Sequence, residues 1–200
     1  MCIICENNYD DNLTELDLNE CKQIKELPIL PNLQYLNCEN TKIKEIPFLP
    51  NLQILYCNYT KIKEIPYLHN LQELDCENTK IKEIPILPNL QTIYCSYTEI
   101  KEIPFLPNLQ HLNFSDTKIK EIPFLHNLQI ITCENTEIKE IPFLPNLHFL
   151  DCENTEIKEI PFLPNLQTLY CKFGYYFSKK KIQILPYNPL ICTPQMYNLF

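Results

Sequence analysis

Hydrophobic and polar residues alternate along this chain in a short pattern that returns every 19 residues. The same leucine recurs at Leu33, Leu52, Leu71, Leu90, Leu109, Leu128, Leu147 and Leu166. Each unit follows the pattern L-x-x-L-x-C-x-x-T-x-I-K-E-I-P-x-L-P-N, and an earlier copy from Leu13 carries one extra residue. A fixed period of this length is the signature of stacked structural repeats, so we expect the chain to form a solenoid.

Each half of the unit predicts one element of a coil. Leu36 and Cys38 alternate with Tyr35 and Asn37, which is the period of a short strand with one buried face. The second half holds two prolines in most copies, and a helix interior does not tolerate proline. We therefore predict an extended or polyproline-like return. The expected fold is a repeat solenoid with a parallel β-sheet on one face, extended returns on the other and no long helices.

The ends of the chain depart from the repeat, as the caps of a solenoid do. We predict an N-terminal cap with a partial repeat at residues 1–12, about nine repeats at residues 13–173 and a C-terminal cap at residues 174–200. The C-terminal cap includes the run Lys179 to Lys181, which we interpret as a solvated face.

The first copy reads Leu13-x-x-Leu16-x-Leu18-x-x-Cys21-x-x-Ile24, and this pattern resembles the leucine-rich-repeat signature. The short return with its I-P-x-L-P segment is similar to that of bacterial effector-type leucine-rich repeats. A composition poor in Gly and Trp and rich in Ile, Lys, Asn and Tyr also resembles repeat proteins of giant DNA viruses. The chain departs from the family in its short unit and in the cysteine that replaces the third leucine.

A threonine column stands where the family typically has asparagine. Its members are Thr41, Thr60, Thr79, Thr98, Thr117, Thr136 and Thr155. The preceding position varies among Asn40, Tyr59, Tyr97 and Asp116. We therefore expect the threonine to point inward and bond backbone groups, while its neighbour faces out.

Seven of the eleven cysteines occupy one inward strand position. They are Cys38, Cys57, Cys76, Cys95, Cys133, Cys152 and Cys171, and Phe114 stands in the copy that lacks one. A column that accepts phenylalanine is a packing column, and a buried thiol behaves as a small hydrophobic group. Strand spacing alone would permit disulfides between neighbours, but the start of the chain lacks the pattern of a secretory leader. We favour reduced core thiols over a bridged ladder.

No pattern predicts a metal, a cofactor or catalysis. Cys2 and Cys5 have the spacing of half a zinc site, but no second cysteine pair or histidine pair accompanies them. Phosphate-cradling loops need glycines, and the only glycine is Gly174. The sequence also lacks catalytic serine and dinucleotide motifs. We therefore predict that the protein is not an enzyme, and we predict no metal and no cofactor.

Charge separates the two faces of the predicted solenoid. The outward strand positions carry eleven acidic residues and one base, Lys172, whereas the return carries thirteen lysines and eleven glutamates. The net charge of −8 therefore lies on the sheet face. An acidic face repels phosphate and attracts Lys and Arg. We predict a basic protein or peptide as the partner, and no nucleic acid.

Aromatic side chains interleave with these acidic residues at the variable strand positions. The predicted partner-binding residues are Tyr35, Tyr56, Tyr59, Glu73, Asp75, Glu77, Tyr94, Tyr97, Phe149, Asp151, Glu153 and Tyr170. A basic side chain entering between them would meet carboxylates below and aromatic faces on either side. The predicted function is that of an intracellular adaptor or inhibitor that grips a basic partner on this sheet.

A second column follows the first proline of the return. It consists of Phe48, Tyr67, Phe105, Phe124, Phe143 and Phe162, with Ile29 and Ile86. We expect these side chains to pack on one another along the spine of the solenoid. If they are exposed instead, they form an apolar stripe suited to self-association. The alternative function is thus a structural or self-associating repeat protein without a specific ligand, and the near-identity of the copies favours it.

The sequence contains no apolar run of membrane-spanning length, so we expect no membrane partner. Together with the missing leader pattern, this predicts a cytoplasmic location. If the protein is viral or an injected effector, that location is the host cytoplasm.

Deleting residues 71–89, one whole repeat, should leave a folded and shorter protein, because each coil contacts only its neighbours. Deleting half of the same repeat should abolish the cooperative unfolding transition, because the inward residues lose their register. Thermal melts followed by circular dichroism measure both variants. A half-repeat deletion that melts like the parent would refute the assigned period.

Overall fold

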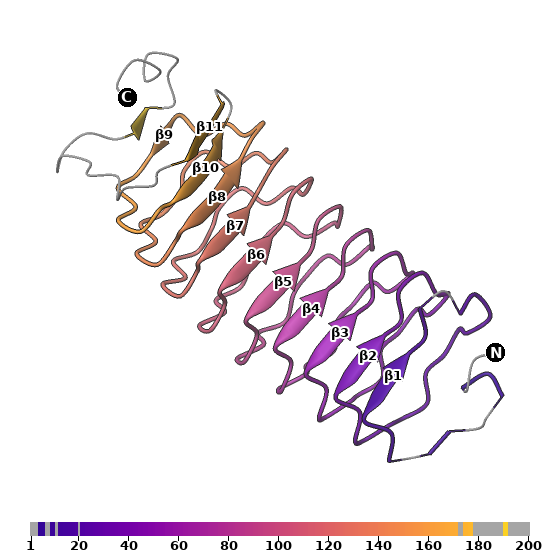
Figure 1. Ribbon diagram of the computed structural model, residues 1–200. Helices are drawn as coiled ribbons and strands as arrows, with labels where there is room; N and C mark the ends of the chain where they lie inside the picture. The colour runs from indigo at the N-terminus through magenta and orange to yellow at the C-terminus, as the bar shows by residue number, and fades with distance from the viewer. Residues whose placement is uncertain are drawn as a thin grey trace.

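The computed structural model describes residues 4–6, 9–10, 12–19, 21–171, 174–177 and 190–191. Its main sheet contains β1 (Glu15–Asp17), β2 (Tyr35–Asn37), β3 (Ile54–Tyr56), β4 (Glu73–Asp75), β5 (Thr92–Tyr94), β6 (His111–Asn113), β7 (Ile130–Thr132), β8 (Phe149–Cys152), β10 (Thr168–Cys171) and β11 (Gly174–Phe177). Strands β1 to β8 and β10 follow one another in parallel, one for each coil, and the coils stack into an elongated solenoid (Figure 1). The described residues contain no helix, and so none that could cross a membrane. The predicted solenoid with a parallel sheet on one face is confirmed.

The 19-residue period becomes the register of this sheet. Leu36 of β2 lies opposite Leu55 of β3, and Leu55 lies opposite Leu74 of β4. The same step continues along the chain to β8. In the first step Leu16 pairs with Leu36, so the extra residue of the first copy falls in the return and not in the strand.

The L-P-N end of each unit forms the turn that leads into the next strand. In one copy the Leu52 amide donates to the Leu49 carbonyl oxygen at 3.2 Å, across Pro50 and Asn51. Proline suits the second position of such a turn because its φ is fixed. The Asn51 side-chain amide then donates to the Pro31 carbonyl of the preceding coil at 2.8 Å. The same inter-coil clamp recurs at Asn70, Asn89, Asn108, Asn127, Asn146 and Asn165.

The core is a stack of equivalent layers. The buried side chains of one coil are Leu71, Leu74, Cys76, Ile81, Ile84 and Leu87, and equivalent residues repeat this packing along the solenoid. Phe114 fills the cysteine position of its coil and is fully buried, which confirms that this is a packing column. The Thr79 hydroxyl donates to the Cys76 carbonyl at 2.7 Å, which confirms that the threonine points inward.

The cysteine column is buried in this core. No disulfide joins Cys38, Cys57, Cys76, Cys95, Cys133 and Cys152, and all six are buried. Burial raises the pKa of each of these thiols, to about 12 at Cys38 and Cys152, because an apolar core disfavours the thiolate. These cysteines therefore pack in the core as protonated thiols, and those of Cys95, Cys133 and Cys152 lie 3.3 Å from a carbonyl oxygen of the next coil.

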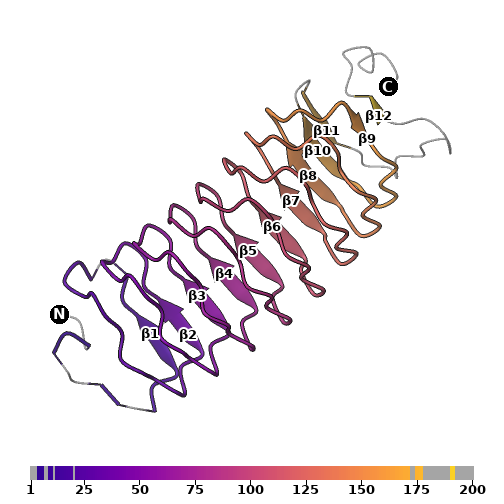
Figure 2. The same cartoon turned by 180° about the vertical axis from the view of Figure 1, so that it is seen from behind.

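Short antiparallel pairings close the C-terminal end. Strand β11 pairs antiparallel with β10 and ends the parallel run. Strand β9 (Glu159–Ile160) lies in the last return and pairs antiparallel with β12 (Leu190–Ile191), as the view from behind shows (Figure 2). At the other end, Ile4 and Tyr9 pack against the core. The run Lys179 to Lys181, predicted to be a solvated face, lies outside the described residues.

The column after the first proline of each return is exposed, so the expectation that it packs along the spine is wrong. Between 49% and 74% of each residue is accessible to solvent. This column, which we call the apolar stripe, comprises Ile29, Phe48, Tyr67, Ile86, Phe105, Phe124, Phe143 and Phe162. Each return has three inward positions, which are filled in one coil by Ile81, Ile84 and Leu87. Ile86 directly precedes Leu87 in an extended segment, so its side chain is left on the outside.

Candidate partner-binding face

The predicted site residues of three central coils come together on β3, β4 and β5. Asp75 lies opposite Tyr56 on one side and opposite Tyr94 on the other. Neighbouring strands are about 4.8 Å apart, so the two tyrosines stand about 10 Å apart with the carboxylate between them. Tyr56 and Asp75 are partly buried, and Tyr94 is exposed. We call Tyr56, Tyr59, Glu73, Asp75, Glu77, Tyr94 and Tyr97 the central patch.

Part of the central patch is already hydrogen-bonded within the protein. The Tyr56 hydroxyl donates to Glu73 Oε1 at 2.8 Å, and the Tyr35 ring meets the Tyr56 ring edge-on with centroids 5.8 Å apart. Burial, followed by the hydrogen bond to Glu73, raises the pKa of Tyr56. Asn113 Nδ2 donates to Glu77 Oε1 at 3.2 Å. Glu73 is therefore oriented by the preceding coil and Glu77 by a residue two coils further on, which the sequence alone did not indicate.

Asp75 lies at the centre of the patch, and its pKa is raised to about 6. Burial is the largest cause, and the neighbouring carboxylates of Glu77, Glu39 and Glu73 add to it. The Glu77 amide donates to Asp75 Oδ1 at 3.1 Å and opposes the shift. A cation that entered the patch would relieve this repulsion and favour the charged carboxylate.

Two tyrosines of the patch have an unusual backbone. Tyr59 and Tyr97 have φ values of 55° and 56°, in the left-handed region, and 57% of each residue is exposed. The equivalent positions of other coils hold Asn40, Asn78, Asp116, Asn135 and Asn154, with φ between 53° and 55°. Asparagine and aspartate tolerate this conformation, whereas other residues with a side chain lose about 1–2 kcal/mol. Strained backbone concentrates at functional sites, so the strain strengthens the case for both tyrosines.

Four of the remaining predicted residues, Phe149, Asp151, Glu153 and Tyr170, form a second patch on β8, β10 and the turn after β8, whereas Tyr35 lies on β2, where its ring contacts Tyr56 of the central patch. The rings of Phe149 and Tyr170 lie 5.6 Å apart between centroids, and Asp151 lies opposite Tyr170 in the sheet. Burial and a hydrogen bond with Glu134 raise the pKa of Asp151. Glu153 lies two residues after Asp151, in the turn that follows β8. Strands β6 and β7 separate the two patches, so the predicted residues form two clusters. Lys172, the one base predicted on this face, lies outside the described residues.

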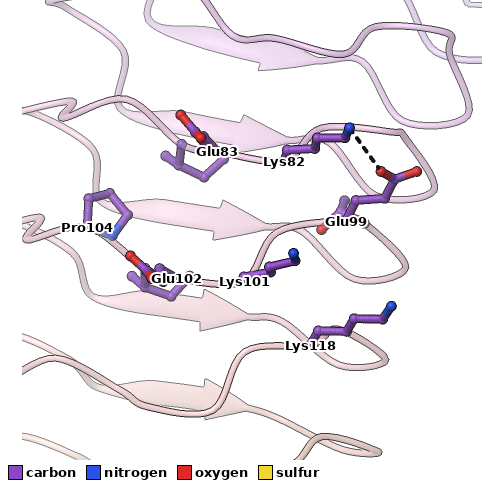
Figure 3. A pocket seen from close by; sticks show the side chains of 10 residues that line it. Lys82, Glu83, Glu99, Lys101, Glu102, Pro104 and Lys118 are labelled. Atoms are coloured by element: carbon purple, nitrogen blue, oxygen red, sulfur yellow. Dashed lines mark ion pairs between the residues drawn. The ribbon is translucent and has the colours of Figure 1, made fainter.

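The return face holds a shallow hollow of about 850 Å³ near the middle of the solenoid (Figure 3). Its charged lining consists of Lys82, Lys101 and Lys118 with Glu83, Glu99 and Glu102. Lys82 Nζ and Glu99 Oε2 form an ion pair at 3.8 Å, so opposite charges are mixed and the hollow favours no single ligand charge. Within the described part of the chain, which omits Cys2, no three His, Cys, Asp or Glu side chains are grouped to hold a metal.

Sequence comparison identifies the repeat. The family described as Leucine Rich repeats (2 copies) matches overlapping segments that together span residues 11–146. The chain belongs to the leucine-rich-repeat family. Leucine-rich repeats typically serve as protein-interaction modules, because their stacked strands present an extended binding surface. A search of curated proteins found no significant match.

Solved leucine-rich-repeat structures share the fold. YopM from Yersinia enterocolitica is 27% identical, with a TM-score of 0.73, over 82% of this chain and 38% of that chain. YopM from Yersinia pestis, described as a leucine-rich effector protein, is 29% identical, with a TM-score of 0.72, over 79% of this chain and 48% of that chain. The functional domain of InlJ from Listeria monocytogenes, which includes a cysteine ladder, is 24% identical, with a TM-score of 0.64, over 80% of this chain and 44% of that chain.

The chain spans less than half the length of each of these three structures. The predicted similarity to bacterial effector-type leucine-rich repeats is confirmed by the two YopM structures. The resemblance to repeat proteins of giant DNA viruses stays a prediction.

Replacing Tyr59 with asparagine should raise the free energy of unfolding by about 1 kcal/mol, because asparagine tolerates the left-handed backbone. The converse change, Asn78→Tyr at the same position of the next coil, should lower it by a similar amount. Urea unfolding of both variants and the parent measures the difference. A Tyr59→Asn variant less stable than the parent would contradict the assignment of strain to this position.

Proposed function

We propose that the protein is a protein-interaction module that binds a basic protein or peptide on its acidic, tyrosine-bearing sheet face. The observation that carries this proposal is the central patch. There Tyr56 and Tyr94 flank Asp75 of β4, and the exposed, strained Tyr59 and Tyr97 lie in the turns that follow β3 and β5, on either side of the turn after β4 that carries Glu77. A chain selected only for a stable solenoid would hold asparagine at both tyrosine positions, as most of its other coils do.

The chemistry of the patch suits a lysine or arginine side chain. Such a group would pair with Asp75 and Glu77 and stack against the tyrosine rings on either side. An exposed ion pair contributes about 0.2–1 kcal/mol and a cation–π contact about 0.5–2 kcal/mol, so several contacts must act together. Four strand spacings separate Asp75 from Asp151, or about 19 Å, and an extended peptide crossing the strands would reach both patches.

This proposal includes a cytoplasmic location, in the host if the protein is injected or viral. The buried cysteine column supports it, because thiols persist in reducing compartments.

A second candidate function is self-association through the apolar stripe. The exposure of all eight stripe residues favours it, because contiguous apolar surface marks interaction sites. Sedimentation velocity over a range of protein concentrations tests it, and a sedimentation coefficient independent of concentration at the monomer value would exclude it.

Binding of a fluorescent oligolysine peptide tests the sheet-face proposal. Replacing Asp75 and Glu77 together with lysine should weaken binding at least about tenfold and slow association, because attraction becomes repulsion. The matched control, Glu83→Lys with Glu102→Lys on the return, changes the net charge equally and should bind nearly as the parent does. Tyr56→Ala with Tyr94→Ala should chiefly speed dissociation. Equal losses in the two charge variants would show that bulk charge, and not the patch, attracts the peptide.

The same binding should weaken as the pH falls from about 8 to about 5, while lysine stays charged throughout. Asp75, with a pKa of about 6, carries its charge above that pH and loses it below. An Asp75→Asn variant should bind less well at the higher pH and show a smaller pH dependence. This variant should fold, because Asn37 Oδ1 accepts the Glu39 amide at 3.1 Å in the same turn of another coil. Equal pH dependence in the parent and the variant would show that Asp75 is not part of the binding site.

A further inference from the structure

One column decides the charge of each coil on the return face. Every coil repeats an adjacent lysine and glutamate, such as Lys44 and Glu45, whose charges cancel. The position two residues before that lysine varies in sign, and its exposed members are Lys42, Lys61, Lys80, Glu99, Lys118, Glu137 and Glu156. We call this the variable column. The coils before Glu99 are therefore positive, and those at the C-terminal end are mostly negative.

Ion pairs within the chain follow the same division. Glutamates of the variable column pair with a lysine of the preceding coil in Lys82–Glu99 at 3.8 Å, Lys120–Glu137 at 2.8 Å and Lys139–Glu156 at 3.6 Å. Among the residues that the structure describes, Lys42 and Lys61 form no ion pair. The positive coils are thus left with uncompensated charge on the return, six residues before the apolar stripe in each coil.

We propose that a second copy of the chain docks on the return face in antiparallel orientation, with the two apolar stripes in contact. The proposal rests on self-association, the second candidate function above, and adds its geometry. A two-fold axis across the middle of the stripe makes the interface self-complementary. It places Ile29 opposite Phe162, Phe48 opposite Phe143, Tyr67 opposite Phe124 and Ile86 opposite Phe105.

The stripe has the size that a stable dimer needs. A fully buried aromatic residue covers about 150–250 Å², so eight roughly half-exposed apolar residues offer on the order of 800 Å². A standard protein interface buries about 800 Å² on each partner. Eight coils at about 4.8 Å give the stripe a length of roughly 35 Å, and two stripes with the same repeat match coil for coil.

Charge selects the antiparallel orientation. The variable column of one copy then faces that of the other in reverse order, with Lys42 opposite Glu137, Lys80 opposite Glu99 and Lys61 opposite Lys118. Two of these three contacts are attractive, and the two-fold axis repeats each of them. In a parallel dimer the two-fold axis would run along the stripe and place the two variable columns on opposite sides of it, so these attractive contacts would be lost.

Sedimentation equilibrium of the full chain with Lys42→Glu or Lys61→Glu tests this orientation. The two changes fall in one column on adjacent coils and alter the net charge equally. Lys42→Glu should raise the dimer dissociation constant about three- to tenfold, because it places glutamate opposite Glu137. Lys61→Glu should lower it by a similar factor, because it places glutamate opposite Lys118. Adding Glu137→Lys to Lys42→Glu should restore the parent's dissociation constant.

The outcomes separate the orientation from self-association itself. A parent that stays monomeric at high micromolar concentration overturns both, and the sheet-face proposal is unaffected. A dimer on which Lys42→Glu and Lys61→Glu act alike overturns the antiparallel orientation alone. Phe105→Ser with Phe124→Ser, both exposed positions, should abolish the dimer. Persistence of the dimer in that variant, with an unchanged circular dichroism spectrum, shows that the stripe is not the interface.

Discussion

Every coil of this solenoid depends on the coils before and after it to bury its inward side chains. The backbone shares that dependence, because the Cys57 amide donates to the Asp75 carbonyl of the next coil at 2.8 Å, and the Cys76 amide donates to the Tyr94 carbonyl at 2.9 Å. An isolated coil would leave its apolar edges and its strand amides in water. The inward positions must therefore repeat with the same spacing in each coil, and the asparagine clamp at the turn holds that spacing from outside the core.

This constraint leaves the outward positions free to differ, and the two faces use that freedom in different ways. The sheet face gathers carboxylates and tyrosines in the central patch, and burial beside other acids raises the pKa of Asp75 to about 6. The return face keeps one exposed apolar residue in every coil and varies the sign of a single column six residues before it. One uniform scaffold therefore presents a charged, aromatic surface, which we propose binds a basic partner, and an apolar surface, which we propose binds a second copy of the chain.

The period and the alternation within it were enough to predict the coils, the strands and the buried threonine and cysteine columns, because spacing sets register in a solenoid. The apolar stripe was predicted to be buried because its residues are hydrophobic, and this prediction was wrong. In the extended return Leu49 points into the core, so the side chain of the preceding Phe48 points to solvent. The clamp from Asn51 was missed because its acceptor lies 20 residues earlier, in another coil. The left-handed backbone of Tyr59 was not predicted either, although most of the equivalent positions hold asparagine. The bond from Tyr56 to Glu73 depends on side-chain geometry across neighbouring strands, which spacing alone does not give.

Native-state hydrogen exchange tests most directly the claim that the coils stabilise one another through a single register. The amides of Cys57, Cys76 and Cys95, which donate to the following coils, should exchange with similar, high protection, because opening a central coil requires its neighbours to open too. Protection should decrease toward the first coil, where Leu18 makes the equivalent bond to Asn37. A central coil that exchanges faster than the terminal ones would contradict the account, because it would open without its neighbours.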